Sequence, residues 1–87
     1  MQVFDFDEDK SKANFKKHGL DFHVAQQLWE DPDLLEIQAK STDEKRFLLV
    51  ARIEGKHWSV VVTYRNEIIR IISVRRSRKK EVKLYEG

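Results

Sequence analysis

The stretch RFLLVARIEGKHWSVVVTYRNEIIRIISV, residues 46–74, decides the fold of this chain. It contains three runs rich in Val, Ile, Leu and aromatic residues, at 46–53, 58–65 and 68–74, and this composition is typical of β-strands. The breaks between the runs centre on Gly55-Lys56 and Asn66-Glu67, and breaks of this length favour tight hairpins. The stretch therefore predicts an antiparallel meander.

Alternation along these strands predicts which side chains share a face of the sheet. Two-residue loops at both breaks fix the register, and one face is then almost wholly apolar, with Phe47, Leu49, Ala51, Ile53, Trp58, Val60, Val62, Tyr64, Ile69 and Ile71. We expect helices to cover it. The opposite face is apolar in its middle, but Arg46, Thr63, Arg65 and Arg70 meet at one end. The register sets Arg65 opposite Arg46, and Thr63 opposite Arg70.

The segments around the meander supply those helices. Asp7 is placed to cap a helix over residues 8–18 that ends at Gly19, and Asp21 caps a second helix over 22–30, terminated by Asp31-Pro32. Residues 3–6 and 34–39 are further strand candidates, 40–45 are a polar turn, and 77–86 form a final helix that packs Val82 with Leu84 or Tyr85. Together these elements predict an α+β fold, a small sandwich of helices on a sheet.

Composition limits the class of protein. At 87 residues the chain has room for one domain, residues 1–87, with a modest core. It has no cysteine, which fits a reducing cytoplasm. The apolar runs are too short to span a bilayer, and residues 1–5 lack the pattern of a signal peptide. We therefore expect a cytoplasmic protein without a membrane partner.

The formal net charge of +2 is distributed unevenly. Residues 1–45 hold 6 Lys/Arg against 11 Asp/Glu, whereas residues 65–87 hold 8 against 3. A basic second half can attract a polyanion, and the run Arg75, Arg76, Arg78, Lys79 and Lys80 can bind phosphate backbones without reading sequence. The same charges also fit an ordinary solvated surface.

The arginines at one end of the sheet are a candidate anion site. Like charges held opposite one another destabilise a sheet, and an anion bound between guanidinium groups relieves this repulsion through paired hydrogen bonds. The alternative is that Glu44, Glu54 or Glu67 neutralises them. No metal or cofactor site is expected, because His18, His23 and His57 lack zinc-ligand spacing and the chain has neither a phosphate loop nor a nucleophile elbow.

Several blocks of the chain resemble a known family. In the N-terminal half, the residues that carry this resemblance are Asp7, Lys10, Asn14, Lys17-His18-Gly19, Phe22 and Ala25. This half resembles that of the BrnT toxins of bacterial type II toxin-antitoxin systems. The C-terminal half of the chain also resembles that of the BrnT toxins. This resemblance rests on residues 63–65 (Thr-Tyr-Arg), residues 69–75 (Ile-Arg-Ile-Ile-Ser-Val-Arg), Glu81 and Tyr85. The resemblance covers nearly the whole chain. The family usually has Ala-Thr where this chain has Ser77-Arg78, so we expect Ser77 to cap the last helix one residue earlier.

The resemblance implies a RelE-like fold and a ribonuclease that arrests translation. It also implies that an antitoxin, BrnA, neutralises the toxin by forming a hetero-oligomer with it. In that complex the antitoxin binds operator DNA, and the toxin contacts the DNA only indirectly. Such enzymes work without metal, because the 2′-hydroxyl of the RNA attacks the adjacent phosphate. The antitoxin is expected over or near the basic residues.

We expect Arg65, Arg70 and Arg75 to form the phosphate-binding core of that site, with Arg46 and Tyr85 assisting. Tyr85 is a candidate proton carrier, and His18 is the candidate base on family grounds, although a histidine that merely ends a helix is an equal reading. His57, at a hairpin tip, is not selected. Arg76, Arg78, Lys79 and Lys80 are expected to bind RNA.

Two other functions fit the same residues. One is a non-enzymatic module that binds RNA or the ribosome and uses the arginines only as phosphate contacts. The other is a protein-interaction domain whose basic last helix docks an acidic partner.

Overall fold

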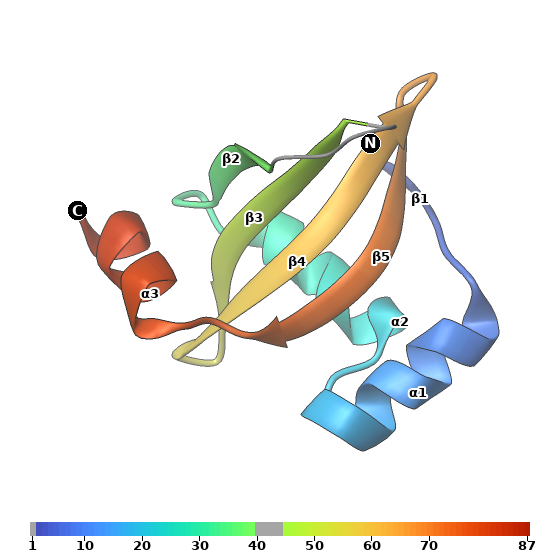
Figure 1. Ribbon diagram of the computed structural model, residues 1–87, viewed down its shortest axis with the longest axis horizontal. Helices are drawn as coiled ribbons and strands as arrows, with labels where there is room; N and C mark the ends of the chain where they lie inside the picture. Colours follow the sequence, from blue (N-terminus) through green and yellow to red (C-terminus); the bar gives the residue numbers. More distant parts are fainter. Residues whose placement is uncertain (1, 40–44) are drawn as a thin grey trace.

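The computed structural model describes residues 2–39 and 45–87, and Figure 1 shows that it is an α+β structure, as the sequence predicts. Its five-stranded sheet has the order β1-β5-β4-β3-β2, in which β1 is parallel to β5 and the other neighbours are antiparallel. The strands are β1 (Val3–Asp5), β2 (Leu35–Ala39), β3 (Arg46–Ile53), β4 (Lys56–Arg65) and β5 (Ile68–Arg76). The helices are α1 (Glu8–His18), α2 (Phe22–Ala25), the 3-10 helix η1 (Gln26–Glu30) and α3 (Lys79–Glu86). The expected turn at 40–45 lies outside the described residues, except for Lys45.

The predicted helix over 22–30 is wrong in one respect, because it consists of α2 followed by η1. Asp21 caps it as expected, since its Oδ1 accepts the backbone N–H of Val24 at 2.8 Å. The residue before a proline is driven out of helical geometry, and Asp31, before Pro32, is extended with ψ 117°. The tightening into a 3-10 helix ahead of that stop is a common way for a helix to end.

The β3–β4 hairpin turns one residue earlier than predicted. Its loop is Glu54-Gly55, with φ 51° and 79°, because this type of hairpin needs positive φ at both loop positions and glycine accepts it most readily. Ile53 therefore pairs with Lys56, and Phe47 with Val62. This register keeps every side chain on its predicted face but does not set Arg65 opposite Arg46, so that pairing was wrong.

The β4–β5 hairpin turns at Asn66-Glu67 as predicted, and Thr63 pairs with Arg70. Further along, β5 contains a β-bulge, because Val61 pairs with Ser73 whereas Val62 pairs with Ile71. The extra residue, Ile72, reverses the alternation of the strand. The bulge therefore places Arg75 on the same face as Arg70.

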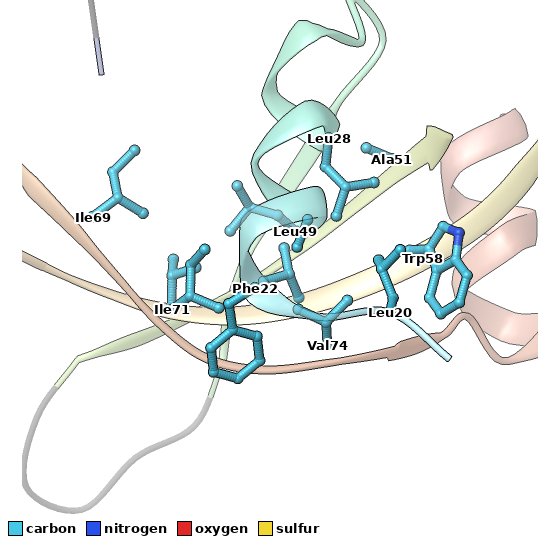
Figure 2. Close-up of a cluster of buried hydrophobic side chains, with 12 residues drawn as sticks. Leu20, Phe22, Leu28, Leu49, Ala51, Trp58, Ile69, Ile71 and Val74 are labelled. Carbon is cyan, nitrogen blue, oxygen red and sulfur yellow. The ribbon is translucent and has the colours of Figure 1, made fainter. Parts of the chain in front are cut away.

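Helices α2 and η1 cover the apolar face, as the alternation predicts. Figure 2 shows Phe22 and Leu28 packed over Leu49, Ile71 and Val74. These side chains are at most 2% exposed. Most other predicted residues of this face belong to the same cluster or pack against it, namely Phe47, Ala51, Ile53, Trp58, Val60, Val62 and Ile69. Tyr64 is the exception, because it is 40% exposed.

The helix α1 lies beside β5 where β1 has ended (Figure 1). β1 pairs only with residues 68–70 of β5, which leaves backbone groups further along that edge without a strand. The buried carboxamide of Asn14 replaces it: Oδ1 accepts the N–H of Val74 at 3.2 Å, and Nδ2 donates to the carbonyl of Leu20 at 2.7 Å. Asn14 thus fixes α1 against the sheet.

The helix α3 packs on the other face of the sheet, at the end near the β3–β4 hairpin. Its N-cap is Arg78, whose N–H donates to Glu81 at 2.9 Å. The expected cap at Ser77 was wrong, because the Ser77 hydroxyl instead pairs with that of Ser59 at 2.7 Å. Tyr85 is half-buried on the sheet side while Leu84 is 54% exposed. Across residues 2–39 and 45–87, no helix has the length and apolar character needed to cross a membrane.

Candidate functional site

The face opposite α2 and η1 gathers the candidate residues, and we call it the basic face. One end of it, the arginine end, carries Arg46, Thr63, Arg65 and Arg70. The other, the α3 end, carries Arg52, His57, Ser59 and Arg75 below α3. Thr63 pairs with Arg70 and Ser59 with Arg75, so the ends are about 13 Å apart along β4. The structure thus brings Arg65 and Arg70 together but places Arg75 elsewhere on the same face.

At the arginine end, Arg70 has a carboxylate partner that the sequence did not identify. Its Nη1 donates to Oδ2 of Asp5, on β1, at 2.5 Å. The two side chains are 32% and 56% exposed, so solvent screens the pair and it contributes little to stability. Within the described part of the chain, the buried hydroxyl of Thr63 beside it has no hydrogen-bond partner. Arg70 is thereby oriented and remains accessible.

At the α3 end, Arg75 is held more firmly. Its guanidinium donates to both carboxylate oxygens of Glu81, at 2.8 and 2.7 Å. Glu81 is 9% exposed and also accepts the hydroxyl of Ser59 at 2.8 Å. The hydrogen bond from Arg75 outweighs burial and lowers the pKa of Glu81 to about 2, and the same bond raises the pKa of Arg75. Both groups are therefore charged at neutral pH.

Tyr85 lies in a second network at the α3 end. Its hydroxyl donates to Oδ2 of Asp31 at 2.6 Å, and burial together with this bond raises the pKa of Tyr85 to about 12. Burial opposes ionisation of Asp31, but hydrogen bonds from Tyr85 and from the backbone of Asp33 and Arg52 outweigh it and lower its pKa. Tyr85 is thus a neutral hydroxyl on a carboxylate, and it ties α3 to the residues after η1.

His57 is the residue that sequence reasoning missed. It was passed over as a hairpin tip, but β4 begins at Lys56 and α3 folds back over it. Its Nε2 lies 2.6 Å from Oε2 of Glu86, and the ring of Tyr85 meets its ring edge to face at 5.2 Å. No local sequence pattern signals this, because the contact joins residues 29 apart.

The remaining predicted residues, apart from Arg46 at the arginine end, lie outside these two groups, and Arg76, which pairs with Trp58, is on the apolar face of the sheet. His18 ends α1, and its side chain makes no hydrogen bond or ion pair with any described residue. Arg76 lies over the ring of Trp58 at 5.4 Å and donates from Nε to the carbonyl of His57 at 3.3 Å. The others of the basic run, Arg78, Lys79 and Lys80, are exposed at the start of α3, and Arg46 is exposed at the start of β3.

The chemistry of this face suits an anion rather than a metal ion. In the described ranges, no three His, Cys, Asp or Glu side chains gather closely enough to hold a metal. Guanidinium groups fixed by carboxylates offer planar, oriented donors for phosphate. A histidine and a tyrosine beside them supply groups that can hold or move a proton.

Comparison with curated proteins finds no similar sequence. The family model for the ribonuclease toxin BrnT, of type II toxin-antitoxin systems, matches residues 6–81. That range contains the strands of the basic face and the part of α3 that includes Glu81. Since the match spans most of the 87 residues, the chain belongs to the BrnT family of ribonuclease toxins.

Proposed function

We propose that this chain is a metal-independent endoribonuclease that acts in the cytoplasm, inhibits translation by cutting RNA, and is held inactive by a BrnA-like antitoxin. The observation that carries the proposal is the arrangement of Arg70 and Arg75. Each guanidinium lies on the basic face, in hydrogen-bonding contact with a carboxylate from another element, Asp5 for Arg70 and Glu81 for Arg75.

RNA cleavage through the 2′-hydroxyl needs three things from the protein. It needs a group to take a proton, a group or solvent to return one, and positive charge beside the phosphorus while it carries extra negative charge. Arginine stays protonated at neutral pH, so Arg65 and Arg70, with Arg46 at the same end of the face, and Arg75 at the α3 end are assigned to phosphate binding and charge stabilisation. Tyr85 and His18 remain candidates for moving the proton.

The separation of the two ends of the basic face suits a strand of RNA better than a single phosphate. Arg70 is held by Asp5 on β1 and Arg75 by Glu81 on α3, at positions about 13 Å apart along the sheet, so the two guanidinium groups are suited to different phosphates. An RNA strand lying along β4 and β5 meets both. The exposed cations of residues 78–80 extend the same positive surface beyond the sheet, and such contacts position a backbone without reading its sequence.

The decisive experiment incubates the purified chain with single-stranded RNA in excess EDTA and follows the RNA on a denaturing gel. Cleavage in EDTA supports the proposal. Binding without cleavage supports a non-enzymatic module instead, and cleavage only after Mg²⁺ is restored contradicts metal independence. In parallel, Arg65→Ala, Arg70→Ala and Arg75→Ala are expressed without antitoxin and scored for growth, with Lys16→Ala on α1 as the charge-matched control. Full toxicity of all three would contradict the site.

The antitoxin is proposed to cover the basic face, because covering the RNA path silences the toxin most directly. A partner with acidic side chains complements this surface. The proposed assembly is a hetero-oligomer of toxin and antitoxin in which only the antitoxin binds operator DNA directly. Charge reversal of Lys79 and Lys80 to Glu should weaken the complex in a titration, whereas reversal of Lys12 and Lys16 on α1 should not. The opposite pattern would place the antitoxin on α1.

A further inference from the structure

We infer that His57 is the group that takes the proton in RNA cleavage, so that the reacting phosphate lies at the α3 end of the basic face. The inference rests on the ribonuclease activity proposed above and adds a residue that neither the sequence pattern nor the family resemblance selected. Three observations carry it: the position of His57 between arginines, the carboxylate on one ring nitrogen, and the freedom of the other.

The first observation is the register around His57. Arg52 on β3 pairs directly with His57, and Arg75 pairs with Ser59, two residues further along the same face. Directly paired side chains on a sheet have Cβ atoms about 5 Å apart and diagonal neighbours about 7 Å apart. An imidazole with a guanidinium on either side is within reach of a phosphate that those guanidinium groups hold.

The second observation is the contact with Glu86. The carboxylate oxygen lies 2.6 Å from Nε2 of His57, and a carboxylate at one ring nitrogen fixes the ring orientation and stabilises the imidazolium that forms when the other nitrogen takes a proton. The ring of Tyr85 packs edge to face on the imidazole, at an interplanar angle of 82°. The imidazole is therefore held by α3 in one orientation.

The third observation concerns Nδ1. Among residues 2–39 and 45–87, this nitrogen has no hydrogen-bond partner, and the His57 side chain is 20% exposed. The charged and titratable groups around the ring are Glu86 and Tyr85 from α3, Arg52 from β3 and Arg75 from β5, with Asp31 beyond Tyr85. Arg76 contacts only the backbone carbonyl of His57. Nδ1 is thus the ring nitrogen that is not engaged by a carboxylate, and the proton transfer is assigned to it.

The chain contains a natural comparison in His23. Its Nε2 also contacts a glutamate, Glu8, at 2.9 Å, and an aromatic ring, Phe6, also meets it edge to face. That side chain is 57% exposed and lies on α2, away from the basic face. A histidine, a glutamate and an aromatic ring thus occur together twice, and only His57 has arginines beside it on the sheet.

The cleavage step replaces one P–O bond of the RNA with another. The 2′-oxygen attacks phosphorus and forms an O–P bond, while its proton passes to Nδ1 of His57. The bond from phosphorus to the 5′-oxygen of the next nucleotide breaks, and that oxygen leaves with a proton from water. The products are a 2′,3′-cyclic phosphate and a 5′-hydroxyl, and the imidazolium then returns its proton to solvent.

The test is single-turnover cleavage of one RNA in EDTA by the wild type, His57→Ala and the matched control His23→Ala. General base catalysis contributes about 10² to 10⁴ in rate, so His57→Ala should lose activity in that range while His23→Ala stays within about twofold of the wild type. Added imidazole should restore part of the rate to His57→Ala alone. A merely structural histidine would not be rescued in this way, because free imidazole cannot hold α3 in place.

Thermal unfolding of each variant separates chemistry from folding. If His57→Ala does not fold, Glu86→Gln takes its place, since Glu86 is 53% exposed and its replacement keeps the shape; it should lower the rate about tenfold and shift its pH profile. The inference is overturned if the wild type cleaves RNA and folded His57→Ala cleaves it equally fast, or if Glu86→Gln leaves rate and pH profile unchanged. A wild type that binds RNA without cutting it overturns the proposed function instead, and this inference with it.

Discussion

The guanidinium of Arg75 donates hydrogen bonds to both carboxylate oxygens of Glu81, six residues further along the chain. This pair joins the end of β5 to the first turn of α3, and Ser59 extends it to β4. The Arg75–Glu81 pair thus fixes the start of α3 on the sheet, while Tyr85 and Glu86 hold its other end through Asp31 and His57.

The first prediction is a loss of stability in acid that depends on Glu81. Its folded pKa of about 2 lies below the ordinary value of 4.5, so its contribution is complete above about pH 4.5 and is lost as pH falls toward 2. Urea unfolding of the wild type should show stability falling through this window, and Glu81→Gln should show a smaller fall. The exposed Glu8→Gln serves as the control. An identical decline in Glu81→Gln would contradict the assignment.

The second prediction separates the roles of the two ends of the basic face. Arg75→Ala should lower the single-turnover rate at saturating RNA roughly 10² to 10³-fold, the usual effect of removing one charged donor from a transition state. Arg70→Ala should mainly weaken RNA binding, because Arg70 lies about 13 Å further along the sheet. Rate and affinity are measured by titrating enzyme over a trace of labelled RNA. Reversed effects would place the reaction at the arginine end.

The third prediction concerns the exposed basic run. Lys79→Ala should weaken RNA binding only slightly and reduce the slope of log affinity against log salt by about one, since it removes a single phosphate contact. Fluorescence anisotropy across a salt series measures the slope. Lys12→Ala on α1 provides the control, and an equal change of slope there would mean that RNA binds without preference for α3.

The fourth prediction concerns the edge of β5. Asn14→Ala leaves the N–H of Val74 and the carbonyl of Leu20 without their partner, and each is within the buried part of the structure. An unsatisfied buried group costs about 1–3 kcal/mol, so the free energy of unfolding should fall by roughly 2–4 kcal/mol if the two effects add in part. Lys12→Ala, exposed on the same helix, should change it little. Equal unfolding curves would show that water replaces the carboxamide.

Much of the fold could be predicted because its signals are local. The caps at Asp7 and Asp21 and the alternation of β3 and β4 depend on neighbouring residues, and they predicted the starts of α1 and α2 and the two faces of these strands correctly. The register of β3 depended on where Gly55 sits in its turn, which composition alone did not resolve. The site was harder, because its partners are distant: Asp5 reaches Arg70 across 65 positions, and Glu86 reaches His57 across 29.

The β-bulge at Ile72 has an evolutionary consequence. Because it depends on the number of residues in β5 rather than on their chemistry, point substitutions can tune what Arg75 binds, but they leave it on its own side of the sheet. If the same residues ran through β5 in simple alternation, without the bulge, Val74 and Arg75 would exchange faces, putting a charge into the core; deleting Ile72 itself would instead leave Val74 opposite Val60 and Arg75 opposite Ser59. Homologues that keep this chemistry should therefore vary freely in the residue at position 72, and any homologue that lacks the bulge should have a β5 that is one residue shorter.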